Sequence, residues 1–164
     1  MIDHEYLEQD EMSQITNDAE FKQALQNLDA TQQRVVAGKF VEHVLSLSND
    51  GRIKRVIKVA TDSDASQDEV NDALRSAKAA TMDSHTRCGS EGNWTEQAGY
   101  FVARAAVAAI TPQAQSRASG PAWQAAMSCR MAQTSLLIDN ESDEVAANLE
   151  NEWQYSILSD YLKL

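Results

Sequence analysis

The stretch GPAWQAAMSCRMAQTSLLID, Gly120–Asp139, consists almost entirely of alanine, serine and other uncharged side chains. A second stretch of this kind, AGYFVARAAVAAI, covers residues 98–110. Helices that are apolar or small on nearly every side are buried ones, and alanine lets two helix axes approach to the close end of the usual range of roughly 8 to 10 Å. The two stretches therefore predict a central pair of helices that the rest of the chain surrounds.

The rest of the chain also has helical periodicity. It holds two prolines and six glycines, and it lacks the alternating pattern of strands. Helix starts are predicted from capping residues at Asn17, Thr31, Asp50, Ser66, Asn93 and Ser142. Residues 88–93, CGSEGN, are predicted to form a loop. We expect an all-α fold, an orthogonal bundle of about seven helices in a single domain over residues 17–164, after an acidic and poorly patterned segment, residues 1–16.

Charge is distributed unevenly along the chain. The 164 residues include 25 acidic and 14 basic side chains, for a net charge of −11, and residues 1–20 and 139–164 each hold seven acids. Such a surface repels phosphate backbones and anionic lipids, which disfavours nucleic acid and membranes as partners. A basic protein is the favoured partner, although acidic ends also serve solubility alone.

The beginning, MIDHEYLEQDEMSQ, has neither the basic region nor the apolar run of a signal peptide. No stretch approaches the roughly 20 apolar residues of a membrane span. The two cysteines, Cys88 and Cys129, are far apart and form no CxxC motif, which fits reduced thiols and predicts a cytoplasmic protein. A disulfide between them is left open.

Arg130 is the one basic residue within the stretch Gly120–Asp139. At about 100° per residue it shares the arc of Trp123, so it is predicted to point inward. A buried guanidinium needs a partner, because it cannot lose its proton. One interpretation is structural, with Arg130 and also Arg104 bound by acids such as Glu150, Glu152 or Asp83. The alternative is a pocket lined by Arg130 and Arg104 that binds an anionic ligand.

Metal and catalytic motifs are weak. His85 and Cys88 lie three apart, and with His43 and Cys129 they would supply four zinc ligands, but each helix carries its residue on a different stripe. Buried cysteine and histidine are usually ordinary core residues, so no metal and no cofactor are predicted. The chain has no glycine-rich phosphate loop and no Glu-x-x-His pair, which favours a non-enzymatic protein. The three tryptophans, Trp94, Trp123 and Trp153, are predicted to lie in the core.

The pattern as a whole resembles a family of predicted immunity proteins of bacterial polymorphic toxin systems, immunity family five. The segments concerned are RVV and FVEHVL within residues 34–45, NDGRIKRVIKVA at 49–60, the alanine-rich stretches, and EWQYSILSDYL at 152–162. The chain differs from the family pattern at Ile53, where proline is usual, and at Met127 and Met131, where a histidine is often found. The resemblance implies an all-helical protein that neutralises a toxin by binding it, without a catalytic residue.

Two functions from different classes follow from these observations. The first is a non-enzymatic protein-interaction protein, with toxin neutralisation as its specific form. Its partner-binding surface is predicted at the acids between the last two helices, Asp139, Glu141, Asp143 and Glu144. The second is a small-molecule binding protein or enzyme with the anion pocket at Arg130 and Arg104. Homo-oligomerisation through the apolar strip of residues 153–164 is compatible with both.

Overall fold

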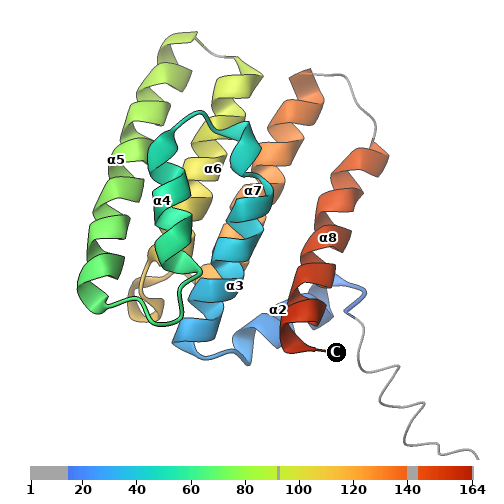
Figure 1. Ribbon diagram of the computed structural model, residues 1–164. Coiled ribbons are helices and arrows are strands. Elements are labelled where there is room, and N and C mark those ends of the chain that lie inside the picture. Colours follow the sequence, from blue (N-terminus) through green and yellow to red (C-terminus); the bar gives the residue numbers. More distant parts are fainter. Residues whose placement is uncertain (1–14, 92, 140–143, 164) are drawn as a thin grey trace, which may run out of the picture.

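The computed structural model of the protein describes residues 15–91, 93–139 and 144–163, with the backbone alone at 88–91, 138–139 and 144–148. This part of the chain contains seven α-helices, two short 3-10 helices and no strand (Figure 1). The elements are α2 (Asp18–Gln26), α3 (Ala30–His43), η1 (Leu45–Leu47), α4 (Gly51–Ala60), α5 (Gln67–Glu91), α6 (Trp94–Ile110), η2 (Gln113–Gln115), α7 (Gly120–Asp139) and α8 (Glu144–Leu162). The all-α prediction is confirmed, whereas the crossing angles of an orthogonal bundle stay a prediction.

Most of the predicted helix starts are confirmed by their caps. The side chains of Asn17, Asp50 and Asn93 each accept a hydrogen bond from a backbone N–H in the first turn that follows. Ser66 and Glu69 form the reciprocal bonds of a capping box. The predicted start at Ser142 lies outside the described residues.

Two predictions of helix ends were wrong. The cap of α3 is Asp29, which forms a capping box with Gln32, so Thr31 lies within the first turn. Helix α5 continues to Glu91, through most of the predicted loop at residues 88–93. A glycine such as Gly89 costs a helix about 1 kcal/mol relative to alanine, and a long helix tolerates that cost.

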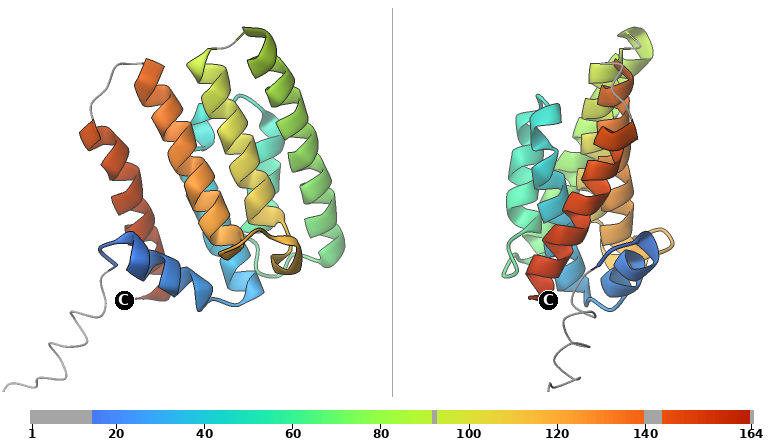
Figure 2. Two further views of the ribbon diagram at one scale, coloured as in Figure 1. Left: turned by 180° about the vertical axis from the view of Figure 1, so that it is seen from behind. Right: turned by 90° about the vertical axis from the view of Figure 1, so that its right-hand side faces the viewer.

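The helices are arranged in two layers. Helices α5, α6 and α7 lie side by side in one layer, and α3 and α4 pack across one face of it (Figures 1 and 2). Helix α8 follows α7 at the edge, where it contacts α7 and α3. Helix α2 lies across the lower end of the layer and contacts α7 (Figure 2).

The two alanine-rich helices, α6 and α7, form the most extensive contact between any two described helices. Their buried residues are mostly alanines, at 98, 103, 105, 106 and 109 of α6 and at 122, 125, 126 and 132 of α7. Because alanine adds little bulk, the helices pack closely, as the sequence predicted. One contiguous core extends from Phe21 of α2 to Leu158 of α8.

Gly38 in the middle of α3 permits a close crossing. A Cβ atom at this position would lie 2.8 Å from Cγ2 of Thr61 and 3.0 Å from Cβ of Ala60, at the end of α4. Separations this short are not found between real side chains. The loss of helix propensity at Gly38 is therefore offset by the close approach of α3 and α4.

Candidate functional site

Arg130 on α7 points into the molecule, as predicted, and its partners come from both flanking helices. Its two terminal nitrogens donate to the carboxylate oxygens of Asp18 on α2, over 3.0 and 2.9 Å. Its Nε donates to Oε1 of Gln154 on α8 over 2.8 Å, and Gln154 in turn donates to the carbonyl of Ala126. The guanidinium also lies 5.6 Å from the ring centroid of Phe21.

This arrangement supports the structural interpretation of Arg130. All three guanidinium nitrogens donate hydrogen bonds, and they join α2 and α8 to α7. The predicted partners were wrong: the acid is Asp18, whereas Asp83 pairs with Arg52 on α4. Asp18 could not be predicted as the partner of Arg130, because the two residues lie 112 positions apart in the chain.

The hydrogen bonds from Arg130 hold the pKa of Asp18 below its ordinary value. Tyr155 on α8 donates to the same carboxylate over 2.6 Å. Burial, together with this bond to an anion, raises the pKa of Tyr155 to about 12. The Asp18 carboxylate therefore accepts hydrogen bonds from both α7, through Arg130, and α8, through Tyr155.

Arg104 on α6 does not share a pocket with Arg130 in the described structure. Its guanidinium lies 5.9 Å from the ring centroid of Tyr100, and it borders a hollow formed with the η2 segment and α7. Arg130 is not among the residues that line this hollow. The two arginines of the predicted anion pocket thus have separate surroundings.

The four acids predicted as the partner-binding surface, Asp139, Glu141, Asp143 and Glu144, lie outside the residues whose side chains are described. Glu144 is the first residue of α8, and the side chains of this helix are described from Leu149 onward. The prediction about these four residues therefore stays a prediction.

The residues considered as a zinc site lie in different surroundings. The ring of His43 stacks on Trp153, His85 lies 5.5 Å from the Tyr100 ring, and Cys129 is a free, buried thiol. Burial raises the pKa of the Cys129 thiol well above its ordinary value, so it is a poor nucleophile. Among the described residues, no group of three or more histidines, cysteines and carboxylates is arranged to hold a metal ion.

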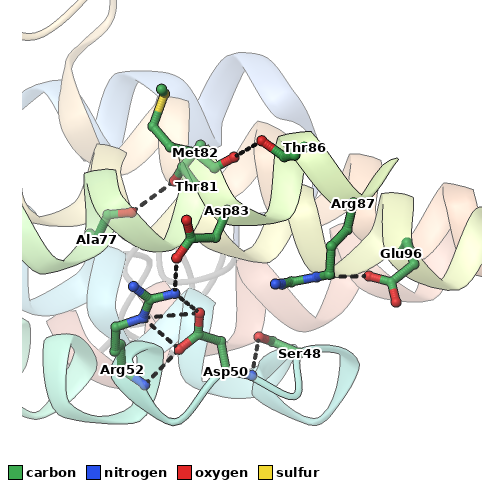
Figure 3. A network of polar contacts seen from close by, with 10 residues as sticks. All are labelled: Ser48, Asp50, Arg52, Ala77, Thr81, Met82, Asp83, Thr86, Arg87 and Glu96. Carbon is green, nitrogen blue, oxygen red and sulfur yellow. Dashed lines mark hydrogen bonds and ion pairs between the residues drawn. The ribbon is translucent and has the colours of Figure 1, made fainter. Parts of the chain in front are cut away.

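A charged hollow of about 420 Å³ lies between α4, α5 and the start of α6. Arg52 bonds to both carboxylate oxygens of Asp50 in its own turn and to Asp83 of α5, over 2.6 to 3.1 Å (Figure 3). Farther along α5, Nε of Arg87 lies 3.5 Å from an Oε atom of Glu96 on α6 (Figure 3).

The charges of this hollow neutralise one another. Both of its arginines face carboxylates, and the hydrogen bonds from Arg52 hold the pKa of Asp50 below its ordinary value. A ligand that binds an arginine here has to displace a carboxylate of the protein. The hollow therefore ties α4, α5 and α6 together and offers little net charge to a ligand.

A second kind of surface lies on α8, where the aromatic ring of Trp153 stacks on His43 at the end of α3. The ring centroids are 3.4 Å apart and the ring planes differ by 5°. Nδ1 of His43 lies 3.1 Å from Oε2 of Glu150, although this buried nitrogen has no hydrogen bond of good alignment. Glu150 is itself buried and accepts from Gln133 and Gln154.

Trp153 was predicted to lie in the core, and this was wrong. It is 39% exposed, and Leu149, one helical turn earlier on the same face, is 58% exposed. Hollows of about 470 and 530 Å³ lie beside Trp153, and His43 and Trp153 line both of them. Trp94 is also exposed, at 41%, whereas Trp123 packs against the core.

Carboxylates surround this surface. Glu42, Glu150, Glu152 and Asp160 line the two hollows, with Lys39 as the only lysine or arginine among the described lining residues. We call the surface formed by Leu149, Trp153 and His43, with exposed Glu42, Glu152 and Asp160, the Trp153 face. It is the one candidate site here that combines an exposed aromatic ring, concave flanks and a net negative charge.

Comparison with protein-family models, with curated proteins and with solved structures finds no match to this chain. Within its described residues, no helix is both long enough and apolar enough to cross a membrane.

Proposed function

We propose that this chain is a non-enzymatic interaction protein that binds a basic protein through the Trp153 face. The observation that carries the proposal is the exposed indole of Trp153 between two hollows whose lining holds four carboxylates and one lysine. Tryptophan is enriched among the residues that contribute most to binding at protein interfaces. The hollows give a partner's side chains concave sites on either side of it.

The charge of the face selects a basic partner over a second copy of the chain. In a twofold dimer the face would meet its own copy, and the negative charges of Glu42, Glu152 and Asp160 would be brought close to a second set of the same charges. A basic partner gains from the same charges, because opposite potentials accelerate encounter. Neutralisation of a bacterial toxin, which the family resemblance implies, is the specific form of this function that we propose.

The proposal is tested by affinity capture with a matched pair of tryptophan variants. Tagged wild type, Trp153→Ala and Trp94→Ala are used as baits in a lysate of cells that encode the chain, at low and moderate salt. Trp94 is the control because it is exposed to the same degree on another helix. We expect a basic protein bound by wild type and Trp94→Ala, and lost from Trp153→Ala.

The captured protein is then purified and its affinity measured. Removal of a central tryptophan is expected to weaken binding roughly 30-fold, the equivalent of about 2 kcal/mol. Glu152→Gln should weaken it severalfold at low salt, whereas Asp68→Asn, the same charge change at an exposed position of α5, should not. If the specific function is neutralisation of a toxin, co-expression of this chain should restore the growth of cells that produce the partner.

Capture that is equal for all three baits, or of acidic proteins only, would contradict the proposal. Far-UV circular dichroism of each variant establishes that a loss of binding is not a loss of fold. A concentration-dependent dimer of wild type that Trp153→Ala abolishes would assign the face to self-association instead.

A further inference from the structure

The hollow beside Arg104 differs from every other hollow described above in its charge. It has a volume of about 200 Å³, and it lies where α6 ends and α7 begins. Its polar lining residues are Arg104, Thr111, Gln115, Ser116, Arg117, Gln124 and Ser128. Two of them are arginines and none is acidic, in a protein whose net charge is −11.

Neither arginine is neutralised by the protein. Within the described residues, no carboxylate lies within ion-pair distance of Arg104 or Arg117. Four other arginines pair with carboxylates and Arg34 donates to backbone carbonyls, while Arg55, exposed on α4, makes no ion pair with a described residue but lines none of the hollows described above. The Arg104 guanidinium lies over the face of the Tyr100 ring, 5.9 Å from its centroid. Two arginine side chains thus border one concave surface, and each guanidinium carries five N–H donors.

The backbone of Arg117, the second arginine of the hollow, is part of a hydrogen-bonded turn. The segment that joins α6 to α7 forms a loop at the common end of the two helices (Figure 2). A hydrogen bond of 3.1 Å from Gly120 N to Arg117 O closes a turn, in which Ser119 and Gly120 have φ of +77° and +87°. The amide of Gln124 donates to Ala118 O over 2.8 Å and ties the loop to α7.

We propose that Arg104 and Arg117 form a binding site for a phosphate group. Two guanidinium groups without a counter-charge match the charge of a phosphate, which is between −1.5 and −2 near neutral pH. Guanidinium presents parallel N–H donors that fit two oxygens of a phosphate, and the hydroxyls of Ser116 and Ser128 are further donors. A hollow of about 200 Å³ suits the phosphate and a small substituent rather than a nucleotide.

This site is independent of the proposed protein partner. The hollow shares no lining residue with the two hollows beside Trp153. The phosphate belongs either to the free ion or to a small phosphate monoester, and the same two arginines recognise both. Inorganic phosphate and O-phosphoserine, used as separate probes, distinguish the free ion from a monoester.

The test is isothermal titration with sodium phosphate and, separately, with O-phosphoserine, at an ionic strength held constant with sodium chloride. Four proteins are compared: wild type, Arg104→Gln, Arg117→Gln and Arg75→Gln. Arg75 is the matched control, because it is an exposed arginine of α5 paired with Asp72. Its replacement changes the net charge equally without touching the hollow.

We expect saturable binding to wild type and Arg75→Gln, weakened about tenfold or more in Arg104→Gln and in Arg117→Gln. Binding of phosphate itself assigns the site to the free ion, and binding of O-phosphoserine alone assigns it to a monoester. Failure of both probes to bind wild type, or equal binding by all four proteins, would overturn the proposal. Unchanged denaturation midpoints in chloride confirm that the variants are folded.

Discussion

Arg130 and Arg104 lie on the two central helices, in closely similar alanine-rich stretches, and yet their surroundings are opposite. Every nitrogen of Arg130 donates to Asp18 or Gln154, and its side chain is only 15% exposed. Arg104 borders a hollow without acidic lining residues, lies over the Tyr100 ring, and makes no ion pair within the described residues. A charged residue in an apolar stretch therefore has two possible roles, and its partners, not its own helix, decide which one it has.

The largest expected effect is that of Arg130→Met on stability. We expect the free energy of unfolding to fall by roughly 2 kcal/mol, because three charge-assisted hydrogen bonds that join α2 and α8 to α7 are lost, while the half-exposed Asp18 carboxylate is left in contact with water. The variant also leaves Oε1 of the fully buried Gln154 without its donor. The measurement is urea denaturation at pH 7.

Arg104→Met is the matched comparison for that prediction. It removes no ion pair within the described residues, so the change should stay within about 0.5 kcal/mol. Equal destabilisation by both substitutions would mean that the two arginines have the same structural role, and the contrast between them would be lost.

A smaller effect, with a defined pH dependence, is expected for Asp18→Asn. At pH 7 the variant should lose about 1 kcal/mol, since the carboxylate is partly exposed and its ion pair is screened by water. The pKa of Asp18 is lowered in the folded protein, so its contribution is present above the ordinary aspartate pKa of about 4 and disappears as the pH falls through the folded value.

The difference in unfolding free energy between wild type and Asp18→Asn should therefore shrink toward zero in denaturation curves recorded at successively lower pH. A difference that is independent of pH from 7 down to 2 would show that the carboxylate is not held by Arg130 in solution. Asp68→Asn, an exposed aspartate of α5 without this network, provides the baseline for general charge effects.

The fold was predicted well because its signals are local. Capping residues such as Asn17 and Asn93 act on the helical turn that follows them. The burial of the two alanine-rich helices is predicted by their composition alone. Thr31 was misassigned because Asp29, two residues earlier, has Gln32 in the position that completes a capping box. That signal was present in the sequence.

The candidate site was predicted poorly because its signals are not local. Of the apolar residues spaced four apart on α8, Leu149 and Trp153 are exposed, and only Ile157 packs against the core. The fully buried positions of α8 are instead Glu150, Gln154 and Leu158, one residue out of phase. Two of these three are polar, and only their partners on α3 and α7 explain their burial.

The smallest expected effect tests whether α8 is tied to Asp18 as Arg130 is. Tyr155→Phe removes the 2.6 Å hydrogen bond to Asp18 and keeps the ring beside Phe21, so we expect a loss of about 0.5 to 1 kcal/mol in urea denaturation. Tyr161→Phe on the same helix removes a hydroxyl that makes no hydrogen bond within the described residues, and it should change stability by less. If the two substitutions have equal effects, Asp18 does not bind α8 through Tyr155. The described polar contacts between α8 and α7 would then be those of Gln154 with Arg130 and Ala126 and that of Gln133 with Glu150, which would make the contrast between Arg130 and Arg104 sharper.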